Sequence, residues 1–403
     1  MPIKTHKVRL YPNQTMQAVL TGLTDYNRYC WNHALTIWND QYTNAVWFDD
    51  KTLRPNERRV RDELVKNKAD WQYRLSARVL QQSVHRLGQA WKNFFNPKMP
   101  NARKPKYHSK RAPKQSFTTD RAHVKDGWLI LDQPREADTP YWQIKMAEPL
   151  RFTGEIKTVT ITKRGNKYYA SISVAVEDTP QPVFYNSWDI AALDLNVDHI
   201  TWSQGVEDTY TPRMARLQDQ IKHYQRQLAR KRRTNPHHFR TKNYARCQAK
   251  LNRAHQRIGY LQQELVNTFT HRVTRDYAVI CLEDLDVNGM KMSRHKAKNV
   301  QRSLFRRLRT TIEYKAAWHH RHVVLADRFF PSTQRCSHCG YIKTKASYGG
   351  KMMLHGDSIY HDHSTYRCYQ CGAVFDRDEN AVENLRQYAA GLTAGAGDRS
   401  LMV

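Results

Sequence analysis

The sequence predicts a multidomain chain in which an α+β part is followed by an α/β part. At 403 residues it is too long for one ordinary core, so we expect two or three domains. Its hydrophobic pattern changes from helical spacing to strict alternation, and then to apolar strands separated by helices. Two Cys-x2-Cys pairs near the end indicate a small metal-binding module within the second part.

The first part opens with a strand and continues into helices. Lys4 to Tyr11 has the character of a strand that ends at a proline. Apolar residues then recur every three or four positions from Val19 to Trp38, and again from about Trp71 to Asn96. Residues 45–70 between them are charged and weakly patterned. We interpret residues 13–100 as a helical insertion.

An antiparallel β domain surrounds this insertion. Between Ser116 and Val176 the hydrophobic period is two, and Arg164-Gly165-Asn166 has the composition of a hairpin turn. We expect the first strand of the chain to join these strands. The sequence therefore predicts a small antiparallel β-barrel, or an open sheet, formed by residues 1–12 and 101–182.

The second part begins with the apolar strand Trp188 to Leu195 and its hairpin partner, Ile200 to Trp202. Two long amphipathic segments follow, with apolar residues at helical spacing from Leu217 to Leu228 and from Leu251 to Phe269. This spacing predicts two helices that pack along a shared seam. The strand Tyr277 to Leu282 comes next.

The remaining elements alternate between helix and strand. A helix carries Phe305, a strand follows at Val323 to Leu325, and a short last helix covers Glu379 to Tyr388. We predict an α/β domain of residues 183–330 and 373–388, with residues 331–372 as an inserted cysteine module. The Gly/Ala-rich residues 389–403 should form a flexible tail.

Composition limits the partners and the compartment. Lys and Arg number 66 against 37 Asp and Glu, a net charge of +29, which predicts a polyanionic partner. We find no apolar run long enough to cross a bilayer and no signal peptide. The seven cysteines include three scattered ones that look buried, which indicates metal binding in a reducing compartment. We expect a cytoplasmic protein, associated with the nucleoid through its charge, of unknown oligomeric state and most simply a monomer.

Four cysteines form two matching pairs. Cys336 and Cys339 precede one glycine, and Cys368 and Cys371 precede another. Four thiolates suit a closed structural Zn²⁺ site, and each glycine suits the tight turn that brings two sulfurs to one metal. Incidental or disulfide-bonded cysteines are the alternative. Between the pairs lie histidines that could replace a thiolate, namely His355, His361 and His363.

Polar and basic side chains on the surface are candidates for nucleic-acid contact. Glutamines can bind adenine edges, but two glutamines on a helix are more simply explained as solvated side chains. Basic residues with an aromatic suit phosphates and stacked bases, and a solvated linker is an equal alternative for the loop from Arg103 to Arg111. The candidates are Gln81, Gln82, Arg86, Arg103, Lys104, Lys106, Tyr107, Lys110, Arg111, Arg230, Lys231, Arg232 and Arg233.

Three acids mark the ends of predicted elements. Asp194 and Glu283 close apolar strands, and Asp378 opens the last helix. Converging carboxylates repel one another, and divalent cations such as Mg²⁺ relieve that repulsion. Two such ions, about 4 Å apart, can promote phosphodiester hydrolysis. Taken singly, each acid has a simpler explanation: a turn residue for Asp194, an arginine partner for Glu283 and a helix cap for Asp378.

Short motifs around these acids resemble the TnpB family of transposon-encoded, RuvC-like nucleases, which are related to type V CRISPR effectors. The three motifs are Leu193-Asp194-Leu195-Asn196-Val197, Leu282-Glu283-Asp284-Leu285 and Asp376-Arg377-Asp378-Glu379-Asn380-Ala381. The segment from Phe330 to Cys336 and the opening Arg9-Leu10-Tyr11-Pro12 are also similar. One difference is Asn196, which stands where the family usually has glycine.

The resemblance implies an RNase H-like (RuvC) nuclease domain with an inserted zinc ribbon, preceded by a wedge-like β-barrel with a recognition insertion. Asp194, Glu283 and Asp378 would bind two catalytic Mg²⁺ ions, and Asp376 would not. It further implies an RNA-guided DNA endonuclease that carries a guide RNA from the transposon end. Such an enzyme cleaves guide-matched double-stranded DNA next to a short motif.

Three alternatives stay open at the level of the sequence. A compact type V CRISPR effector would share the same chemistry. A nuclease-inactive, RNA-guided regulator would be expected to lose acids, and this chain keeps all three. A guide-independent zinc-ribbon accessory to transposition would bind DNA without RNA.

Overall fold

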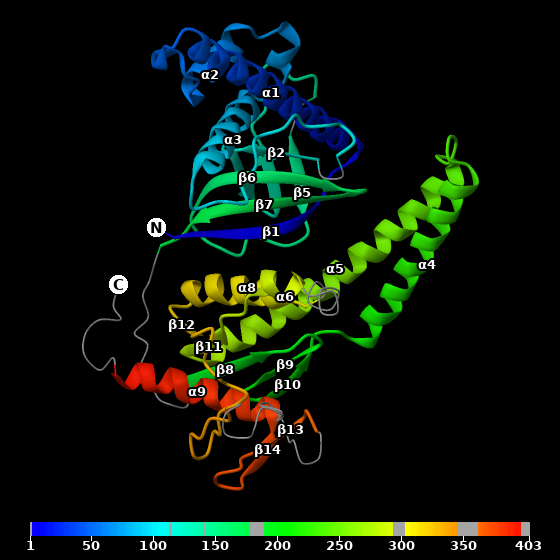
Figure 1. The fold of residues 1–403 in the computed structure, drawn as a ribbon. Helices are drawn as coiled ribbons and strands as arrows, with labels where there is room; N and C mark the ends of the chain where they lie inside the picture. Colours follow the sequence, from blue (N-terminus) through cyan, green and yellow to red (C-terminus); the bar gives the residue numbers. More distant parts are fainter. Residues whose placement is uncertain are drawn as a thin grey trace. The chain divides into compact units, whose positions relative to one another are not determined.

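A curled antiparallel sheet forms the centre of the first of two compact units, residues 1–179 (Figure 1). The computed structural model describes residues 2–112, 115–139, 142–177, 189–292, 303–344 and 362–395. The strands of this sheet are β1 (Ile3–Tyr11), β2 (Gln115–Thr119), β3 (Ala122–Lys125), β4 (Trp128–Leu131), β5 (Gln143–Met146), β6 (Glu155–Arg164) and β7 (Lys167–Ala175). Their order is β2-β6-β7-β1-β5-β4-β3, so the first strand joins the sheet as predicted.

The β6–β7 hairpin turns where the sequence indicates. Arg164 pairs with Lys167, and Gly165 in the turn has φ +57°. Of the two predicted forms, a small barrel or an open sheet, the described residues form a curled open sheet with β2 and β3 at its two ends. The three strands at one end, β3, β4 and β5, have only four residues each. The architecture is a half-barrel.

Helices follow β1 and pack on the same core as the sheet. They are α1 (Gln14–Trp47), the 3-10 turn η1 (Lys51–Leu53), α2 (Glu57–Lys66), the 3-10 turn η2 (Asp70–Arg74) and α3 (Ala77–Phe95). Leu23 of α1, Leu87 of α3 and Ile172 of β7 belong to one continuous cluster of buried apolar side chains.

The structure adds one helix to the predicted insertion and corrects the start of another. Residues 45–70 contain the end of α1 and all of α2, whose Val60 and Leu64, one turn apart, are both buried. The helix expected from Trp71 begins at Ala77, because the Ser76 hydroxyl caps it by accepting from the Arg78 N–H.

The second unit, residues 180–403, is built on a mixed sheet. Its strands are β8 (Ile190–Leu195), β9 (His199–Trp202), β10 (Gly205–Asp208), β11 (Val279–Glu283) and β12 (His322–Ala326). The order is β10-β9-β8-β11-β12, with β8, β11 and β12 parallel and the β8–β9–β10 meander antiparallel. β8 and β11 therefore lie side by side with their carboxyl ends at the same edge. The predicted strand start at Trp188 lies outside the described residues.

Helices cover both faces of this sheet, so its central strands are apolar up to Asp194 in β8 and Glu283 in β11. The helices of this unit are α4 (Pro212–Thr234), α5 (Lys242–Asp276), α6 (Val287–Met292), α8 (Phe305–Trp318) and α9 (Arg377–Gly395), of which α5, α8 and α9 pack on the sheet. Leu193 and Leu282 pack toward α5 and α8, whereas Ala192 and Cys281 pack toward α9. The alternation of strand residues thus fills two cores.

Three further features complete the second unit. α4 and α5 form the predicted helical hairpin, with a seam that includes Ile221 and Leu251. β13 (Thr365–Arg367) and β14 (Val374–Asp376) form a small hairpin around the second cysteine pair. α9 continues through Gly395 with Ala389 fully buried, so the flexible tail expected from residue 389 is wrong for residues 389–395. None of the described helices is both long and apolar enough to cross a membrane.

Candidate active site and metal centre

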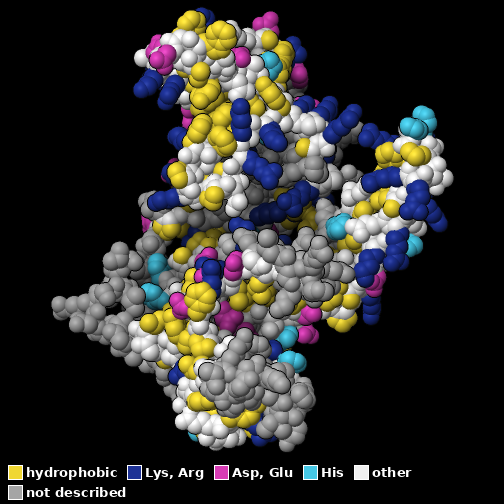
Figure 2. Space-filling view, in the orientation of Figure 1, with side chains coloured by type: hydrophobic (Ala, Val, Ile, Leu, Met, Phe, Trp, Pro, Cys, Tyr) yellow, Lys and Arg dark blue, Asp and Glu magenta, His cyan; other side chains and the backbone are white. Residues whose placement is uncertain are grey.

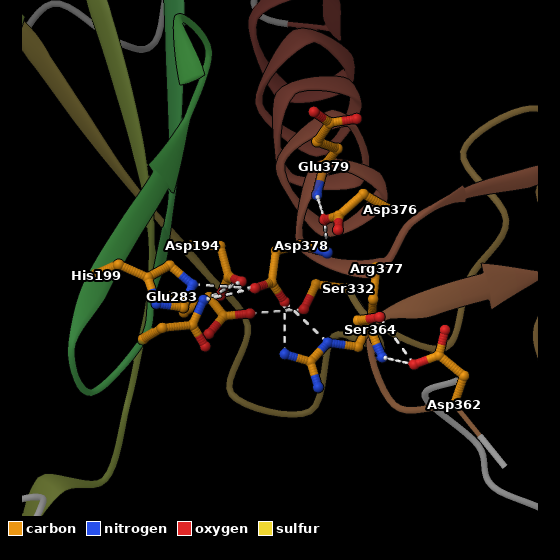
Figure 3. Close-up of polar contacts among 11 residues, drawn as sticks. Asp194, His199, Glu283, Ser332, Asp362, Ser364, Asp376, Arg377, Asp378 and Glu379 are labelled. Carbon is orange, nitrogen blue, oxygen red and sulfur yellow. Dashed lines mark hydrogen bonds and ion pairs between the residues drawn. The ribbon is translucent and has the colours of Figure 1, made fainter. Parts of the chain in front are cut away.

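Three acids from distant parts of the sequence converge at one edge of the second sheet (Figure 3). Asp194 lies near the end of β8 and Glu283 at the end of β11, and the two strands pair in parallel up to Leu193 and Leu282. Asp378 is the second residue of α9, which packs against the same strands. Parallel pairing explains the first two positions, and helix packing explains the third.

A network of neutral and cationic donors holds these carboxylates. The Asn196 side-chain amide donates to Asp194 Oδ2 at 3.0 Å and to Asp378 Oδ2 at 3.2 Å. Arg377 donates to Asp378 Oδ1 at 2.6 and 2.8 Å. Two further contacts are His199 Nε2 to Asp378 Oδ2, 3.2 Å, and Ser332 Oγ donating to Glu283 Oε1 at 2.6 Å. Asn196, the residue that differs from the family pattern, thus joins two of the three acids.

Burial and mutual repulsion disfavour negative charge at this edge. Asp194 is 5% exposed, and burial, followed by the charges of Glu283 and Asp378, raises its pKa to about 8. Burial also raises the pKa of Glu283, an effect that its hydrogen bond from Ser332 opposes. Shifts of this kind, from burial and like charges together, are typical of functional sites.

The neighbouring acids have ordinary structural roles. Asp376 Oδ1 accepts from the backbone N–H groups of Asp378 and Glu379 at 2.9 and 3.1 Å, so Asp376 caps α9. The alternative of an arginine partner applies to Asp284, which pairs with Arg309 and Arg328. Helix capping therefore explains Asp376, and arginine pairing explains Asp284, and both residues are sequence neighbours of the three candidates.

The donor set suits a hard divalent cation. Three carboxylates provide oxygen ligands, and a cation among them would reverse the repulsion that raises the Asp194 pKa. In the part of the chain that the structure describes, the carboxylate oxygens of the three acids do not all lie within 4.8 Å of one another. Repulsion and the contacts of Asp378 with Arg377 and His199 account for this separation.

Four thiols form a second candidate metal centre. The sulfurs of Cys336, Cys339, Cys368 and Cys371 all lie within 4.8 Å of one another. Two sulfur–sulfur distances are 3.8 and 3.6 Å. A tetrahedron with Zn–S bonds of about 2.3 Å has edges of about 3.8 Å, so the cluster fits zinc.

The two knuckles have matching backbones. The N–H of Gly340 donates to Cys336 O and that of Gly372 to Cys368 O, with φ of +78° and +75° at the two glycines. A side chain is strained at such φ values, which explains glycine at both positions. Of the histidines between the pairs, His355 and His361 lie outside the described residues.

α9 connects the thiol cluster to the acids. The Asn380 amide donates to Arg335 O and accepts from Ser337 N–H, and the Asn384 amide donates to Ser332 O and Arg335 O. Both asparagine side chains are buried. The segment that enters the first knuckle therefore fixes the helix that carries Asp378, and through Ser332 it also holds Glu283.

The candidates for nucleic-acid contact have different environments. Gln81 and Gln82 are only partly exposed, and Gln82 helps Arg78 to lower the pKa of Asp120. Arg86 is exposed and donates to Thr118 Oγ1 at 3.2 Å. The remaining first-unit candidates, Arg103, Lys104, Lys106, Tyr107, Lys110 and Arg111, are all exposed.

The basic run at the helical hairpin is the end of α4. Arg230, Arg232 and Arg233 are exposed and Lys231 is partly buried. Arg232 donates to Tyr244 Oη at 2.6 and 2.8 Å and lies over the Phe239 ring, so it stabilises the tip of the hairpin. Figure 2 shows Lys and Arg side chains along this hairpin.

Sequence reasoning missed four partners of the acids as functional residues. Ser332 and Arg377 stand inside the motifs that carry the family resemblance, and Asn196 was noted only as a departure from them. His199 follows the first motif by two residues and becomes a neighbour of Asp378 only through the β8–β9 hairpin. The first three could have been found from their positions, but His199 required the fold.

Three family models match successive parts of the chain. A helix-turn-helix domain matches residues 1–45, a probable transposase of the OrfB group residues 171–294, and a Cas12f1-like TNB domain residues 305–385. The first match covers β1 and most of α1, and these residues form one strand and one helix. The third match contains all four cysteines and two of the residues that hold the acids.

Known proteins resemble the chain over almost its full length. A protein of Streptomyces pristinaespiralis, named "Putative RNA-guided DNA endonuclease", is 26% identical over 98% of this chain and 90% of its own length. A Mycobacterium tuberculosis protein with the same type of name is 21% identical over 96% of this chain and 86% of its own length. The solved Cas12f1–sgRNA–target DNA complex contains a chain of similar fold, with a TM-score of 0.53 and 11% sequence identity. The match covers 96% of this chain and 98% of that one. These matches agree with the motifs around the three acids and support the similarity of the chain to the TnpB family.

Proposed function

We propose that the protein is an RNA-guided DNA endonuclease of a mobile element, which hydrolyses guide-matched double-stranded DNA next to a short duplex motif. The observation that carries this proposal is the convergence of Asp194, Glu283 and Asp378 at one sheet edge. The names of the relatives and the fold shared with a guide RNA–DNA complex support it. The strand order, with an antiparallel meander followed by parallel strands, supports an RNase H-like (RuvC) domain.

The acids are proposed to hold two Mg²⁺ ions. When bound, these ions would supply an activated water and neutralise the charge that develops on the scissile phosphate. The chain positions the ligands: Ser332 orients Glu283, and Asn196 orients Asp194 and Asp378 by one shared amide. Arg377 forms an ion pair with Asp378 and fixes its orientation.

The thiol cluster is proposed to be a zinc ribbon with a structural role. A closed set of four thiolates provides no open ligand position for chemistry. Its contribution to catalysis would be indirect, through the hydrogen bonds of Asn380 and Asn384 to the knuckle segment.

Charge supports a guide RNA and target DNA as partners. The net charge is +29, and the α4–α5 hairpin alone carries fourteen Lys and Arg from Arg213 to Arg257 against the single acid Asp219. Such a field attracts phosphates in a salt-dependent way. A compact type V CRISPR effector is the second candidate, favoured by the Cas12f1-like match and fold. Transposon ends or a repeat array beside the gene distinguish the two.

The proposal is tested by the RNA that the protein carries. We expect purified protein to contain one abundant RNA whose sequence includes a transposon end. Binding to a DNA duplex matched to that RNA should disappear after RNase treatment and return when the RNA is added back. Unchanged binding after RNase treatment would favour a guide-independent DNA-binding protein.

A further inference from the structure

A cavity of about 670 Å³ lies within the first unit, between α1, α3 and the basic loop that precedes β2. It is distinct from the carboxylates and the thiols, which belong to the second unit. Two nucleic-acid candidates that are distant in the sequence, Arg86 and Tyr107, both line it. Its volume is in the range of sites for small organic ligands.

The wall formed by the loop is fixed to α1. Asn32 accepts from the His108 N–H at 2.7 Å and donates to the His108 carbonyl at 3.1 Å. Trp31 Nε1 donates to the Lys106 carbonyl at 2.9 Å, and its ring stacks on His108 with centroids 4.3 Å apart. The cavity is therefore preformed and has a flat aromatic wall.

The charge within the cavity is positive. None of the described residues that line it is Asp or Glu, whereas two are arginines. Arg28 is neutralised by Asp25, but Arg86 has only the neutral Thr118 hydroxyl as a partner among the described residues. Arg86 and His108 both keep solvent-accessible surface, but the protein atoms around the cavity desolvate them. Desolvation lowers the pKa of Arg86, and desolvation followed by the charge of Arg86 lowers the pKa of His108. An anion beside Arg86 would relieve both effects.

The other lining groups are amides and hydroxyls, including Asn27, Gln89, Asn93 and Gln115. Their amide nitrogens are partly engaged, since Gln89 donates to Asn93 and Gln115 donates to backbone carbonyls, whereas the amide oxygens of Gln89 and Gln115 face no donor among the described residues. Such groups recognise the edge of a base and the oxygens of a sugar, as in sites that accept a base removed from its stack. An arginine without an acidic partner suits the phosphate of the same nucleotide. A base that is stacked and paired within a duplex cannot enter a concave site, so the nucleotide that binds here has to be unpaired.

We propose that this cavity binds one unpaired nucleotide of a nucleic-acid strand, with its phosphate on Arg86 and its base against the Trp31–His108 wall. Tyr107 stands at the cavity with 58% of its surface exposed, and its hydroxyl lies 3.2 Å from Thr36 Oγ1. That contact orients a second ring toward an entering base. The nucleotide can belong to RNA or to single-stranded DNA, because both provide the same phosphate and base groups.

The test compares a loss of charge with a loss of space. Labelled 12-nucleotide RNA and DNA of one sequence are titrated into full-length, RNA-free protein in EDTA, so that cleavage does not contribute. Arg86→Gln should weaken binding about tenfold and lower the log–log salt slope by about one. Lys125→Gln, the same charge loss on exposed β3, should weaken it about twofold or less.

Ala90→Leu fills the cavity without changing charge, since Ala90 lines it. This substitution should weaken the binding of RNA, of DNA or of both at least fivefold, while the thermal transition of the protein stays unchanged. The strand that loses affinity identifies the source of the nucleotide. The proposal is overturned if Ala90→Leu binds both strands as the parent does, or if Arg86→Gln has no larger effect than Lys125→Gln. Because the measurement involves no cleavage, its failure would leave the proposed nuclease activity untouched.

Discussion

Replacing Asp194 by asparagine should stabilise the metal-free protein while it abolishes activity. The side chain is 5% exposed and faces Glu283 and Asp378, so its negative charge is unfavourable in the folded chain. Asparagine has nearly the same shape, and its carbonyl oxygen can still accept from Asn196. The substitution therefore removes the repulsion and keeps the hydrogen bond.

The sign and the pH window follow from proton linkage. The pKa of Asp194 is 3.8 in an ordinary environment and about 8 in the fold. Between these values the folded protein holds a proton that the unfolded chain has released, so the free energy of unfolding falls as pH rises. Above pH 8, this pKa shift corresponds to a loss of at most about 6 kcal/mol in the free energy of unfolding. Relaxation of the acids and entry of water should reduce this to about 1–3 kcal/mol, or about 3–10 °C in Tm.

The assay is thermal unfolding in EDTA between pH 5 and 9, with and without added Mg²⁺. The parent should lose Tm toward high pH and regain it with Mg²⁺, whereas Asp194→Asn should be less sensitive to both. Asp208→Asn, an exposed acid in the same unit, is the matched control and should follow the parent. If Asp194→Asn is no more stable than the parent at pH 8 in EDTA, the electrostatic account of the site is wrong.

Two further changes test the supports of the site. Cys368→Ser should release zinc, as measured by metal analysis. It should also reduce cleavage, because the knuckle segment no longer fixes α9 through Asn380. The control Cys247→Ser, in the seam between α4 and α5, should retain zinc. Asn196→Gly restores the family's residue and removes the amide shared by two acids, so Tm in EDTA should fall by a few degrees and the gain in Tm on adding Mg²⁺ should increase. An unchanged response to Mg²⁺ would show that Asn196 does not hold the acids.

Local patterns in the sequence were sufficient for the elements that carry chemistry. The strands before Asp194 and Glu283 are apolar throughout because both of their faces are covered, and this pattern is visible without a structure. The spacing of the knuckles is equally local, and the four sulfurs lie together as the spacing indicates.

Features that depend on tertiary contacts could not be predicted in this way. β3 and β4 have four residues each, and their place at the end of the sheet depends on pairing with β5 rather than on their own composition. α2 is rich in charge and buries only Val60 and Leu64, so its helical pattern is weak over its ten residues. His199 joins the site because a hairpin folds it back toward Asp378, and the cavity in the first unit exists because Asn32 holds a loop that is distant in sequence.

The most direct test of the account is cleavage of plasmid DNA, with the RNA guide, matched target and Mg²⁺, by the parent, Asp378→Ala and Asp376→Asn. The three acids are proposed to act together, so Asp378→Ala should lower the rate at least 10³-fold while guide RNA binding is unchanged. Asparagine caps helices as well as aspartate does, so Asp376→Asn should keep most of the activity. Full activity of Asp378→Ala, with or without loss in Asp376→Asn, would contradict the assignment of the site.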